Sequence, residues 1–453
     1  MLSEFYRVGG FVRDTILGLT PKDVDYVVIG ESPESMTRKG FVQVGGNFPV
    51  FLHPITKDEY ALARSEISNG DGHKDFLYEW KGVSLVQDLS RRDLTINAMA
   101  MTHNGEVIDP YGGQIDLENG VLRHVSPAFL EDPLRVLRVA RFAARYSFAV
   151  APETMELMTQ VAQKGMLNTL TAERVWMETE KALLCKSPNL YFEVLDECGA
   201  LEIIFPEIHD MKGVPQAAKH HAEGDVFIHV MMVIKRAAEL SKGLPDTSRL
   251  RIVAGALLHD LGKTKTPYEL LWDAEGNPLG KHHGHEDPER FGGLLDGLAE
   301  RLRMPKYVRN FAYTCALVHQ NAHRAMDMAE GLARMYEDLG LERQSRHDPA
   351  YLDDFLTMCQ ADAEGRLRTL DNGTVERPLG YKQADYIREA MAAVAAVDAG
   401  VIIQGALKEG CNIDESKGRV VTARNRVGRE FKRAKKTERE HAKSLESDAG
   451  MTP

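Results

Sequence analysis

Two aspartates separated by a single residue, Asp23 and Asp25, stand at the start of the apolar run DYVVIG. Close carboxylates repel each other unless a positive charge lies between them. On a strand, side chains two positions apart project from the same face, so both carboxylates can share cations. Mg²⁺ prefers oxygen ligands and completes its shell with water and substrate phosphates. The pair predicts a magnesium site for phosphoryl transfer, while the alternative is a surface turn, TPKDVD, that leads into a strand.

Glycines and arginines near this pair suit a bound triphosphate. Gly9 and Gly10 allow the backbone to approach phosphates closely, and Arg13 can neutralise their charge. In the segment LSRRDLTINAMA, Arg92 can contact a phosphate, and Asp93 can contact either a ribose hydroxyl or a neighbouring arginine. The alternative for this segment is a simple helix cap.

A third segment, EDPLRVLRVARFAAR, has helical spacing. At about 100° per residue, Arg138, Arg141 and Arg145 fall in one narrow stripe, and Asp132 and Arg135 lie on the adjoining face. An arginine stripe is usually a solvated helix face. Beside a candidate metal site, however, it fits phosphate binding equally well.

The elements that must position these residues change along the chain. Residues 7–108 mix a Gly-Gly turn, short β-rich runs and one helical stretch, which indicates an α/β region. Within it, SEISNGDGHKDF, residues 65–76, has little apolar content and predicts a mobile loop. After Glu131 nearly every segment has helical spacing. The sequence therefore predicts an α+β protein with a mixed first part and a mostly helical remainder.

Length and composition limit the class of protein. With 453 residues the chain exceeds one ordinary core, so we expect two to four compact units. No apolar run approaches the roughly 20 residues of a membrane span, and the start lacks the pattern of a secretory signal. We therefore expect a cytoplasmic protein with no membrane partner. The five cysteines are scattered singly and are expected to be reduced.

The net charge of −11 means that any nucleic acid must be held by a local basic surface. The one clearly basic segment runs from Lys417 to Lys443, where eleven lysines and arginines accompany only three glutamates. We expect this basic tail either to hold RNA phosphates or to be a solvated helix.

Histidines form a second group of candidate residues. They occur in FIHV, LLHDLGK, KHHGHED and LVHQ, as His229, His259 beside Asp260, His285 and His319. Neutral imidazole and carboxylate suit a transition metal. A lone histidine is more often a core residue, but the adjacent His259 and Asp260 favour a metal site.

Seven motifs, in matching order and spacing, resemble bacterial class II tRNA nucleotidyltransferases, the CCA-adding enzymes. They are VGGFVRD, KDVDYVV, EYALARSE, RRDLTINAMA, IDPYGG, EDPLRVLRVARFAARY and ERVWMETEKALL. The likeness runs from Arg7 to about Arg366 and includes an HD domain, as in the multifunctional CCA proteins. It implies a polymerase-β-like nucleotidyltransferase head (1–125), a helical neck and body for nucleotide selection and RNA binding (126–215), an HD phosphohydrolase-like domain (216–335) and a helical C-terminal region with the basic tail (336–453).

The resemblance also implies roles for the residues of the head. Asp23 and Asp25 would be catalytic and bind Mg²⁺, and Asp132 and Arg135 would contact the base edge. A carboxylate accepts from the exocyclic amino group that C and A share, and a guanidinium donates to a ring nitrogen or carbonyl. The remaining nucleotide-binding positions are Gly9, Gly10, Arg13, Arg92, Asp93, Arg138 and Arg141.

The implied reaction is the template-independent addition of C, C and A to tRNA from CTP and ATP. As a hypothesis, the tRNA 3′-hydroxyl attacks the α-phosphorus in line, pyrophosphate leaves, and two metals assist. Glu59 would be either a third carboxylate or a structural strand residue. Residues 65–76 resemble the family's flexible loop, which helps to switch from C to A addition. The protein would be a monomer or a dimer.

The histidines resemble the HD phosphohydrolase arrangement H...HD...H...H. This implies that His229, His259, Asp260, His285 and His319 bind a transition metal such as Ni²⁺ or Mn²⁺, with 2′,3′-cyclic phosphodiesterase, 2′-nucleotidase and phosphatase activities. In one departure, Gln320 stands where the family has aspartate, and Asp327 is a candidate substitute. The alternative is a vestigial HD fold kept for tRNA contact.

Two other functions share parts of this pattern. A poly(A) polymerase has the same head motifs and usually a basic C-terminal extension, but generally lacks the HD domain. An HD hydrolase whose head merely binds tRNA is the second alternative, and the intact set of head residues argues against it. The HD domain and the match beyond the head favour CCA addition.

Overall fold

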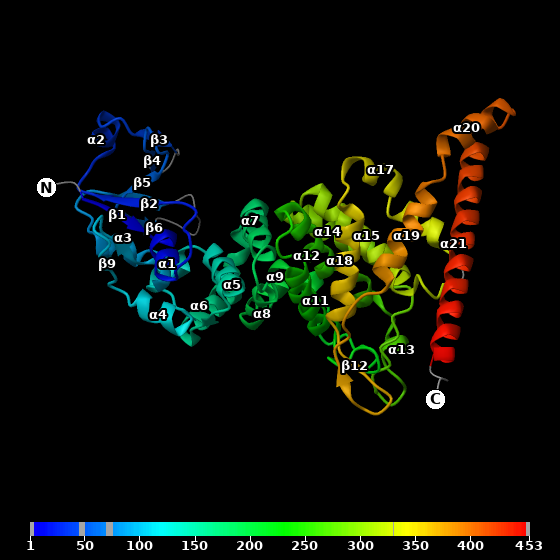
Figure 1. The fold of residues 1–453 in the computed structure, drawn as a ribbon. Coiled ribbons are helices and arrows are strands. Elements are labelled where there is room, and N and C mark those ends of the chain that lie inside the picture. Colours follow the sequence, from blue (N-terminus) through cyan, green and yellow to red (C-terminus); the bar gives the residue numbers. More distant parts are fainter. Residues whose placement is uncertain (1–3, 45–49, 69–75, 329, 450–453) are drawn as a thin grey trace. The chain divides into compact units, whose positions relative to one another are not determined.

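The computed structural model describes residues 4–44, 50–68, 76–328 and 330–449. The chain divides into two compact units, Met1–Pro206 and Glu207–Pro453 (Figure 1). The first unit contains a seven-stranded sheet followed by helices, and the second is almost entirely helical. The predicted α+β class is therefore confirmed.

The sheet of the first unit has the strand order β3-β4-β5-β2-β1-β8-β9. Strand β2 runs antiparallel to β1 and parallel to β5. Its sequence is apolar without alternation because both faces are covered: Val27 belongs to one buried cluster and Val28 to another. The strands are β1 (Glu4–Val8), β2 (Asp25–Ile29), β3 (Val42–Val44), β4 (Val50–Leu52), β5 (Glu59–Leu62), β8 (Ala100–Met101) and β9 (Val107–Ile108).

One end of the central strands brings the sequence motifs together. Asp25, the first residue of β2, pairs with Val8, the last residue of β1. Gly9 follows with a φ of +63°, and the chain turns directly into helix α1 (Gly10–Ile16). The carboxylate pair and the double-glycine turn therefore lie at the same end of the sheet.

Helices make up most of the rest of the first unit. Helix α5 packs against α7 and α8. The elements beyond the central sheet are α2 (Pro33–Arg38), α3 (Leu85–Ser90), the 3₁₀ helix η1 (Thr95–Asn97), α4 (Gly113–Asn119), β10 (Val121–Leu122), η2 (Pro127–Glu131), α5 (Leu134–Tyr146), β11 (Ala149–Val150), α6 (Pro152–Gln163), η3 (Met166–Thr169), α7 (Ala172–Leu183), α8 (Asn189–Glu197) and α9 (Ala200–Ile204). The short helix α10 (Pro206–His209) begins at the last residue of this unit.

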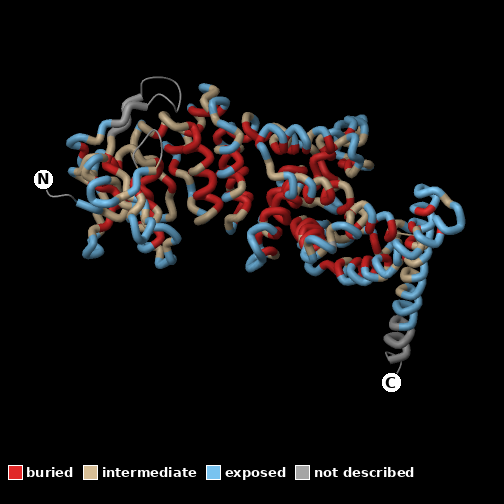
Figure 2. The backbone as a smooth tube through the Cα atoms, turned by 90° about the horizontal axis from the view of Figure 1, so that it is seen from above, coloured by how far each residue is buried: buried red, intermediate tan, exposed pale blue. Residues whose placement is uncertain are grey.

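In the second unit, helix α12 lies at the centre and packs against α11, α15 and α18. Most of the C-terminal helix α21 is exposed (Figure 2). The elements are α11 (Val226–Leu240), α12 (Asp246–Leu258), η4 (Leu261–Lys265), α13 (Tyr268–Leu271), α14 (Pro288–Leu302), α15 (Lys306–Arg324), α16 (Leu332–Asp338), α17 (Leu341–His347), α18 (Tyr351–Glu364), β12 (Arg368–Thr369), β13 (Val375–Glu376), α19 (Gln383–Ala395), α20 (Ala399–Lys408) and α21 (Ile413–Ala449).

One sequence prediction, the loop at residues 65–76, needs correction. Residues 65–76 were expected to form a loop, but Ser65–Ser68 (β6) pairs antiparallel with Phe76–Glu79 (β7), and residues 69–75 lie outside the described residues. One stretch, Gln383–Lys408, does have the length and composition of a membrane span. The structure divides it into α19 and α20, with the Asp398 side chain capping α20, so it is weak evidence for a membrane.

Candidate functional sites

A cleft of about 580 Å³ lies in the first unit and is lined mainly by polar side chains. It receives residues from the turn between β1 and α1, the start of β2, the segment after α3, and helix α5. The lining residues are Gly9, Gly10, Arg13, Asp23, Asp25, Arg91, Arg92, Asp93, Asn97, Asp132, Arg135, Arg138, Arg141, Phe142 and Arg145.

The cleft unites all the residues of the head and neck that the sequence singled out for catalysis and nucleotide binding. Among the described residues that line it, seven arginines accompany four aspartates, although the whole chain has a net charge of −11. Such a local excess of positive charge attracts anions. Arg145 also lines it, as the predicted stripe implied, whereas Asn97 was not predicted as a site residue.

The two candidate metal ligands, Asp23 and Asp25, face this cleft and interact with each other. Desolvation raises the pKa of Asp25 above its ordinary value; Arg92 opposes the increase, and the Asp23 charge adds to it. A cation would relieve this repulsion. Glu59 lies beside Asp25 in the parallel strand register but does not line the cleft, which favours its structural role.

A side chain at Gly9 would displace the end of the Arg92 side chain. A Cβ atom at Gly9 would lie 2.9 Å from Arg92 Nη1, closer than real Cβ contacts allow. The positive φ of Gly9 also disfavours any other residue. The sequence predicts that the backbone at Gly9 closely approaches a phosphate. In the structure, the group that the Gly9 backbone approaches closely is the Arg92 guanidinium.

Buried acidic side chains hold several of the cleft arginines. Asp14 accepts a hydrogen bond from Arg13 Nε at 2.8 Å and from Arg145 Nη2 at 3.0 Å. Asp93 accepts from Arg138 Nε at 2.7 Å and from Asn97 Nδ2 at 3.0 Å. Of the two roles foreseen for Asp93, the structure supports contact with an arginine.

The charge of Asp93 is stabilised in the folded protein. Burial opposes its ionisation, but the Arg138 guanidinium and the Asn97 amide outweigh burial and hold the pKa of Asp93 well below its ordinary value. In return, the Asp93 carboxylate raises the pKa of Arg138. The two residues therefore form a fixed ion pair at neutral pH.

Helix α7 supplies two further partners that sequence reasoning missed. Glu178 is 1% exposed and accepts a hydrogen bond from Arg141, while Arg174 Nη2 lies 3.1 Å from Asp132 Oδ2. Both belong to ERVWMETEKALL, which served only as a similarity motif. The signal that could have revealed Glu178 was its place as an acidic residue on the apolar face of an amphipathic helix.

The histidines converge in the second unit, where four helices contribute. His229 lies on α11, His259 follows α12, and His319 lies on α15. Asp362, on α18, completes the cluster and had not been predicted. Asp327, the suggested substitute, belongs to none of the ligand groups found among the described residues. The missing aspartate is thus supplied by a helix about 100 residues beyond Asp260.

Four of these side chains direct their donor atoms to one point. The distance from His229 Nε2 to Asp362 Oδ1 is 3.2 Å, and that from His259 Nε2 to Asp260 Oδ2 is also 3.2 Å. All four side chains are at most 6% exposed, and neither Nε2 atom has a hydrogen-bond partner among the described residues. Buried polar atoms without partners are rare, so this donor set fits a bound metal.

Surrounding groups fix the orientation of these imidazoles. Glu223 Oε1 lies 3.0 Å from His229 Nδ1, and the Ala256 carbonyl lies 2.8 Å from His259 Nδ1. Second partners of this kind hold the Nε2 lone pair toward a metal. Burial opposes protonation of His259, yet the carboxylates of Asp260 and Asp362 raise its pKa above the ordinary value, because they favour positive charge beside them.

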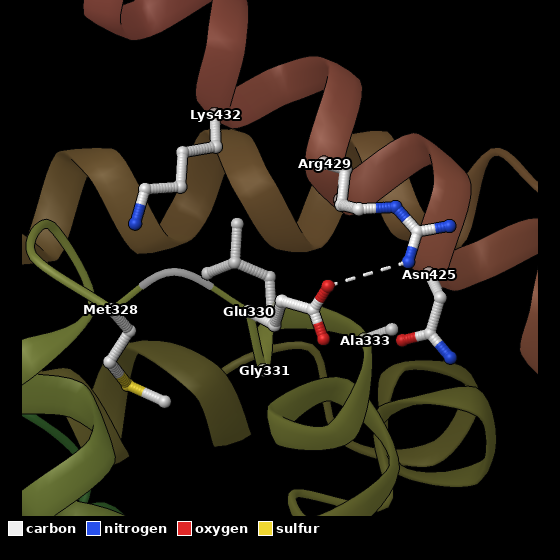
Figure 3. A pocket seen from close by; sticks show the side chains of 9 residues that line it. Met328, Glu330, Gly331, Ala333, Asn425, Arg429 and Lys432 are labelled. Atoms are coloured by element: carbon white, nitrogen blue, oxygen red, sulfur yellow. Dashed lines mark ion pairs between the residues drawn. The ribbon is translucent and has the colours of Figure 1, made fainter.

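The basic tail pairs largely with its own unit. Arg429 lies 3.6 Å from Glu330 (Figure 3), and Lys435 lies 2.6 Å from Glu389. Arg424 is buried and bonded to Glu342. The inner face of α21 therefore packs on its own unit, which neither of the two alternatives, RNA binding or a solvated helix, anticipated.

Comparison with protein families finds three successive matches along the chain. The poly A polymerase head domain matches residues 5–123, and a probable RNA- and SrmB-binding site of polymerase A matches residues 147–212. The HD domain matches residues 226–292. Solved structures of a CCA-adding enzyme with ATP and with CTP have TM-scores of 0.58 and 0.56, each at 18% identity and over 93% of this chain, covering 86% and 87% of those chains. They show a similar fold.

Two relatives that match nearly the whole chain carry the same name. The multifunctional CCA protein of Haemophilus influenzae (strain PittGG) is 44% identical over 431 residues, which is 93% of this chain and 98% of the relative. That of Nitrosospira multiformis is 44% identical over 434 residues, with the same coverage. These full-length matches support CCA addition and not the poly(A) polymerase alternative. The chain belongs to the multifunctional CCA proteins, bacterial CCA-adding tRNA nucleotidyltransferases that carry an HD domain.

Proposed function

We propose that the cleft of the first unit performs the CCA-adding reaction, with Asp23 and Asp25 as ligands of Mg²⁺ and the arginines of the cleft as ligands of the triphosphate. The convergence of all predicted head residues on one basic cleft carries this proposal. When bound there, Mg²⁺ would supply positive charge at the reacting phosphates and lower the pKa of the attacking hydroxyl.

The chain's own residues contribute positioning. Arg13, Arg138 and Arg141 are each held by a buried acidic residue, so their guanidinium groups are oriented before a nucleotide arrives. Preorientation lowers the entropic cost of binding and reaction. The tRNA 3′-hydroxyl attacks the α-phosphorus, a new phosphodiester bond forms, and pyrophosphate leaves with its charge facing these arginines.

Selection of C and A is assigned to Asp132 and Arg135. Arg135 donates to the carbonyls of Ala128 and Arg91, each at 2.7 Å, and a guanidinium has five N–H groups in all. The side chain is thus fixed while donors remain for a base. Arg174 orients the Asp132 carboxylate, which would accept from the amino group of C or A.

The catalytic assignment is tested with Asp23→Asn and Asp25→Asn. Each variant should lose incorporation of CTP and ATP into tRNA that lacks its CCA end, by at least about 10³-fold, while its thermal unfolding stays near that of the parent chain. Glu59→Gln is the matched control, because Glu59 neighbours Asp25 in the sheet but lies outside the cleft lining. Activity retained in both aspartate variants would contradict the metal assignment.

For the second unit we propose a metal-dependent phosphohydrolase for 2′,3′-cyclic and 2′-phosphorylated nucleotides. His229, His259, Asp260 and Asp362 would hold the metal. The Nε2 atoms of the two histidines are buried and have no hydrogen-bond partner among the described residues, which supports this choice. Imidazole ligands favour Ni²⁺ over Mg²⁺, and the two carboxylates of the set also suit Mn²⁺. Gln320 cannot supply a charged ligand, but Asp362 makes one unnecessary at that position.

Hydrolysis of 2′,3′-cyclic AMP by the full chain, with metal analysis, tests this second activity. We expect turnover that Asp362→Asn abolishes. Chelation should also remove the turnover, and reconstitution with the metal should restore it. A chain that binds no metal and leaves the cyclic nucleotide intact would instead be a vestigial HD fold.

The four-part division near residues 125, 215 and 335 belongs to the same proposal, and the three matched families support its order.

A further inference from the structure

We infer that Asn97 is a positioning residue for nucleotide binding, because its side chain links an arginine of helix α1 to an arginine of helix α5. The inference rests on the proposed triphosphate role of Arg13 and Arg138, and it names the side chain that orients the two together. Asn97 itself need not touch the nucleotide.

Asn97 is the last residue of the short 3₁₀ helix η1, and it belongs to the cleft lining. Its backbone N–H donates to the Leu94 carbonyl at 2.9 Å, which holds the turn in place. The residue is 6% exposed, so its side-chain amide is largely removed from water. A buried amide is costly unless its donor and its acceptor both find partners.

The two ends of this amide bind groups of opposite charge. Asn97 Oδ1 accepts a hydrogen bond from Arg13 Nη1, and Asn97 Nδ2 donates to Asp93 Oδ1 at 3.0 Å. A guanidinium only donates and an ionised carboxylate only accepts, so the amide has a single permitted orientation. Both hydrogen bonds have a charged partner, which makes them stronger than bonds between neutral groups.

On the Arg13 side, the amide completes the fixing of the guanidinium. Asp14 Oδ1 lies 2.8 Å from both Nε and Nη2 of Arg13, whereas Asn97 takes Nη1. Partners at two separate edges prevent the guanidinium plane from turning. A guanidinium has five N–H groups, so donors remain for an anion in the cleft.

On the opposite side, the amide acts on helix α5 through one carboxylate. Asp93 Oδ1 accepts from Asn97, while Asp93 Oδ2 accepts from Arg138 Nε at 2.7 Å. The two oxygens belong to one rigid group, so the orientation of the carboxylate sets the place of Arg138. Loss of the amide donor would let this carboxylate turn and carry the guanidinium with it.

The two arginines also lie beside the same aromatic ring. The centre of the Phe142 ring is 5.2 Å from Arg13 Cζ and 5.7 Å from Arg138 Cζ. Both guanidinium groups line the one cleft, although they come from different helices. A nucleotide in the cleft therefore meets two neighbouring cations whose orientations depend on one amide.

Thermodynamic cycles on the KM values of CTP and ATP test this link in the full chain. Arg13→Lys and Arg138→Lys should each raise KM by about 10-fold, because a charge-assisted hydrogen bond is lost. Asn97→Leu removes both polar ends of the amide and should raise KM by a similar factor, with kcat lowered less than about 3-fold. In the Asn97→Leu background each arginine variant should add less than about 3-fold, because its guanidinium has already lost its orientation.

Asn97→Asp separates the two sides of the amide. The new carboxylate still accepts from Arg13, but it repels Asp93. In this background Arg13→Lys should therefore keep its full effect on KM, whereas Arg138→Lys should add little. A role of Asn97 in packing alone would not distinguish between the two arginines.

Asn189→Leu is the matched control. Asn189 is 8% exposed and donates to Glu193 Oε1 at 3.1 Å, but it lies outside the cleft lining. This variant should lower the melting temperature and leave the KM of CTP and of ATP unchanged.

The outcomes separate this inference from the proposed function. If the effects of Asn97→Leu and of each arginine variant simply multiply, the link is overturned and Asn97 has only a structural role. Parent-like KM values in both Arg13→Lys and Arg138→Lys would contradict the triphosphate role itself, and this inference with it. If circular dichroism shows that Asn97→Leu does not fold, Asn97→Ser, which is too short to hold both partners, takes its place in the same cycles.

Discussion

Gly9→Ala would separate backbone strain from displacement of a phosphate-binding arginine. The new Cβ atom would lie 2.9 Å from Arg92 Nη1, whereas ordinary contacts begin at 3.4 Å, so the guanidinium must move by about 0.5 Å or more. Its hydrogen bonds to the Asn97 carbonyl and to Asp88 Oδ2 are both already 3.4 Å long and would break. Arg92 would then lose the orientation that directs it into the cleft.

Two separate effects are expected from this change. The positive φ of Gly9 adds about 1–3 kcal/mol of strain in any variant. A displaced arginine forfeits a charge-assisted hydrogen bond to the triphosphate, worth about 1.5–3 kcal/mol, which corresponds to a KM increase of about 10- to 100-fold for CTP and ATP alike. Gly18→Ala is the control: its φ is +68°, but no atom lies within 4 Å of a Cβ there.

The assay is steady-state incorporation of CTP and ATP, with thermal unfolding measured in parallel. Gly18→Ala should lower stability without changing either KM. In an Arg92→Ala background, Gly9→Ala should raise KM less than about 2-fold, because the residue that it displaces is absent. Equal KM effects of Gly9→Ala in both backgrounds would refute the reasoning and assign the defect to the backbone turn.

Three further predictions concern the acidic and basic partners. Arg174→Met should leave unfolding nearly unchanged, because its pair with Asp132 is partly exposed, yet increase incorporation of UTP or GTP relative to CTP. Glu178→Gln should lower the free energy of unfolding by about 2–3 kcal/mol, because it weakens the buried partner of Arg141; an unchanged urea midpoint would contradict this. The pKa of Asp93 is depressed in the folded state, so its charge stabilises the fold above about pH 4 and progressively less below. The loss of stability caused by Asp93→Asn should therefore be larger at pH 7 than in acid, as urea unfolding at both pH values would measure.

Short-range patterns predicted which residues line one cleft. Asp23 and Asp25 line one cleft, as their spacing predicted, although β2 begins only at Asp25 and Asp23 lies in the segment just before it. Arg138, Arg141 and Arg145 line the same cleft because a helix repeats every 3.6 residues. The local backbone alone sets these directions, so the spacing in the sequence was sufficient. The loop prediction for residues 65–76 was wrong at both ends of the segment. There the pairing of β6 with β7 overrides weak local preferences.

Partners from distant segments were decided only by the tertiary structure. Glu178 reaches Arg141 because α7 packs against α5, and Asp362 joins Asp260 because α18 packs against α12. The sequence by itself determined which side chains could bind a triphosphate and a metal, and through its motifs the family. Which acidic residue holds which arginine, and which aspartate completes the histidine cluster, depends on helix packing, because residues far apart in sequence meet only when buried surfaces close together.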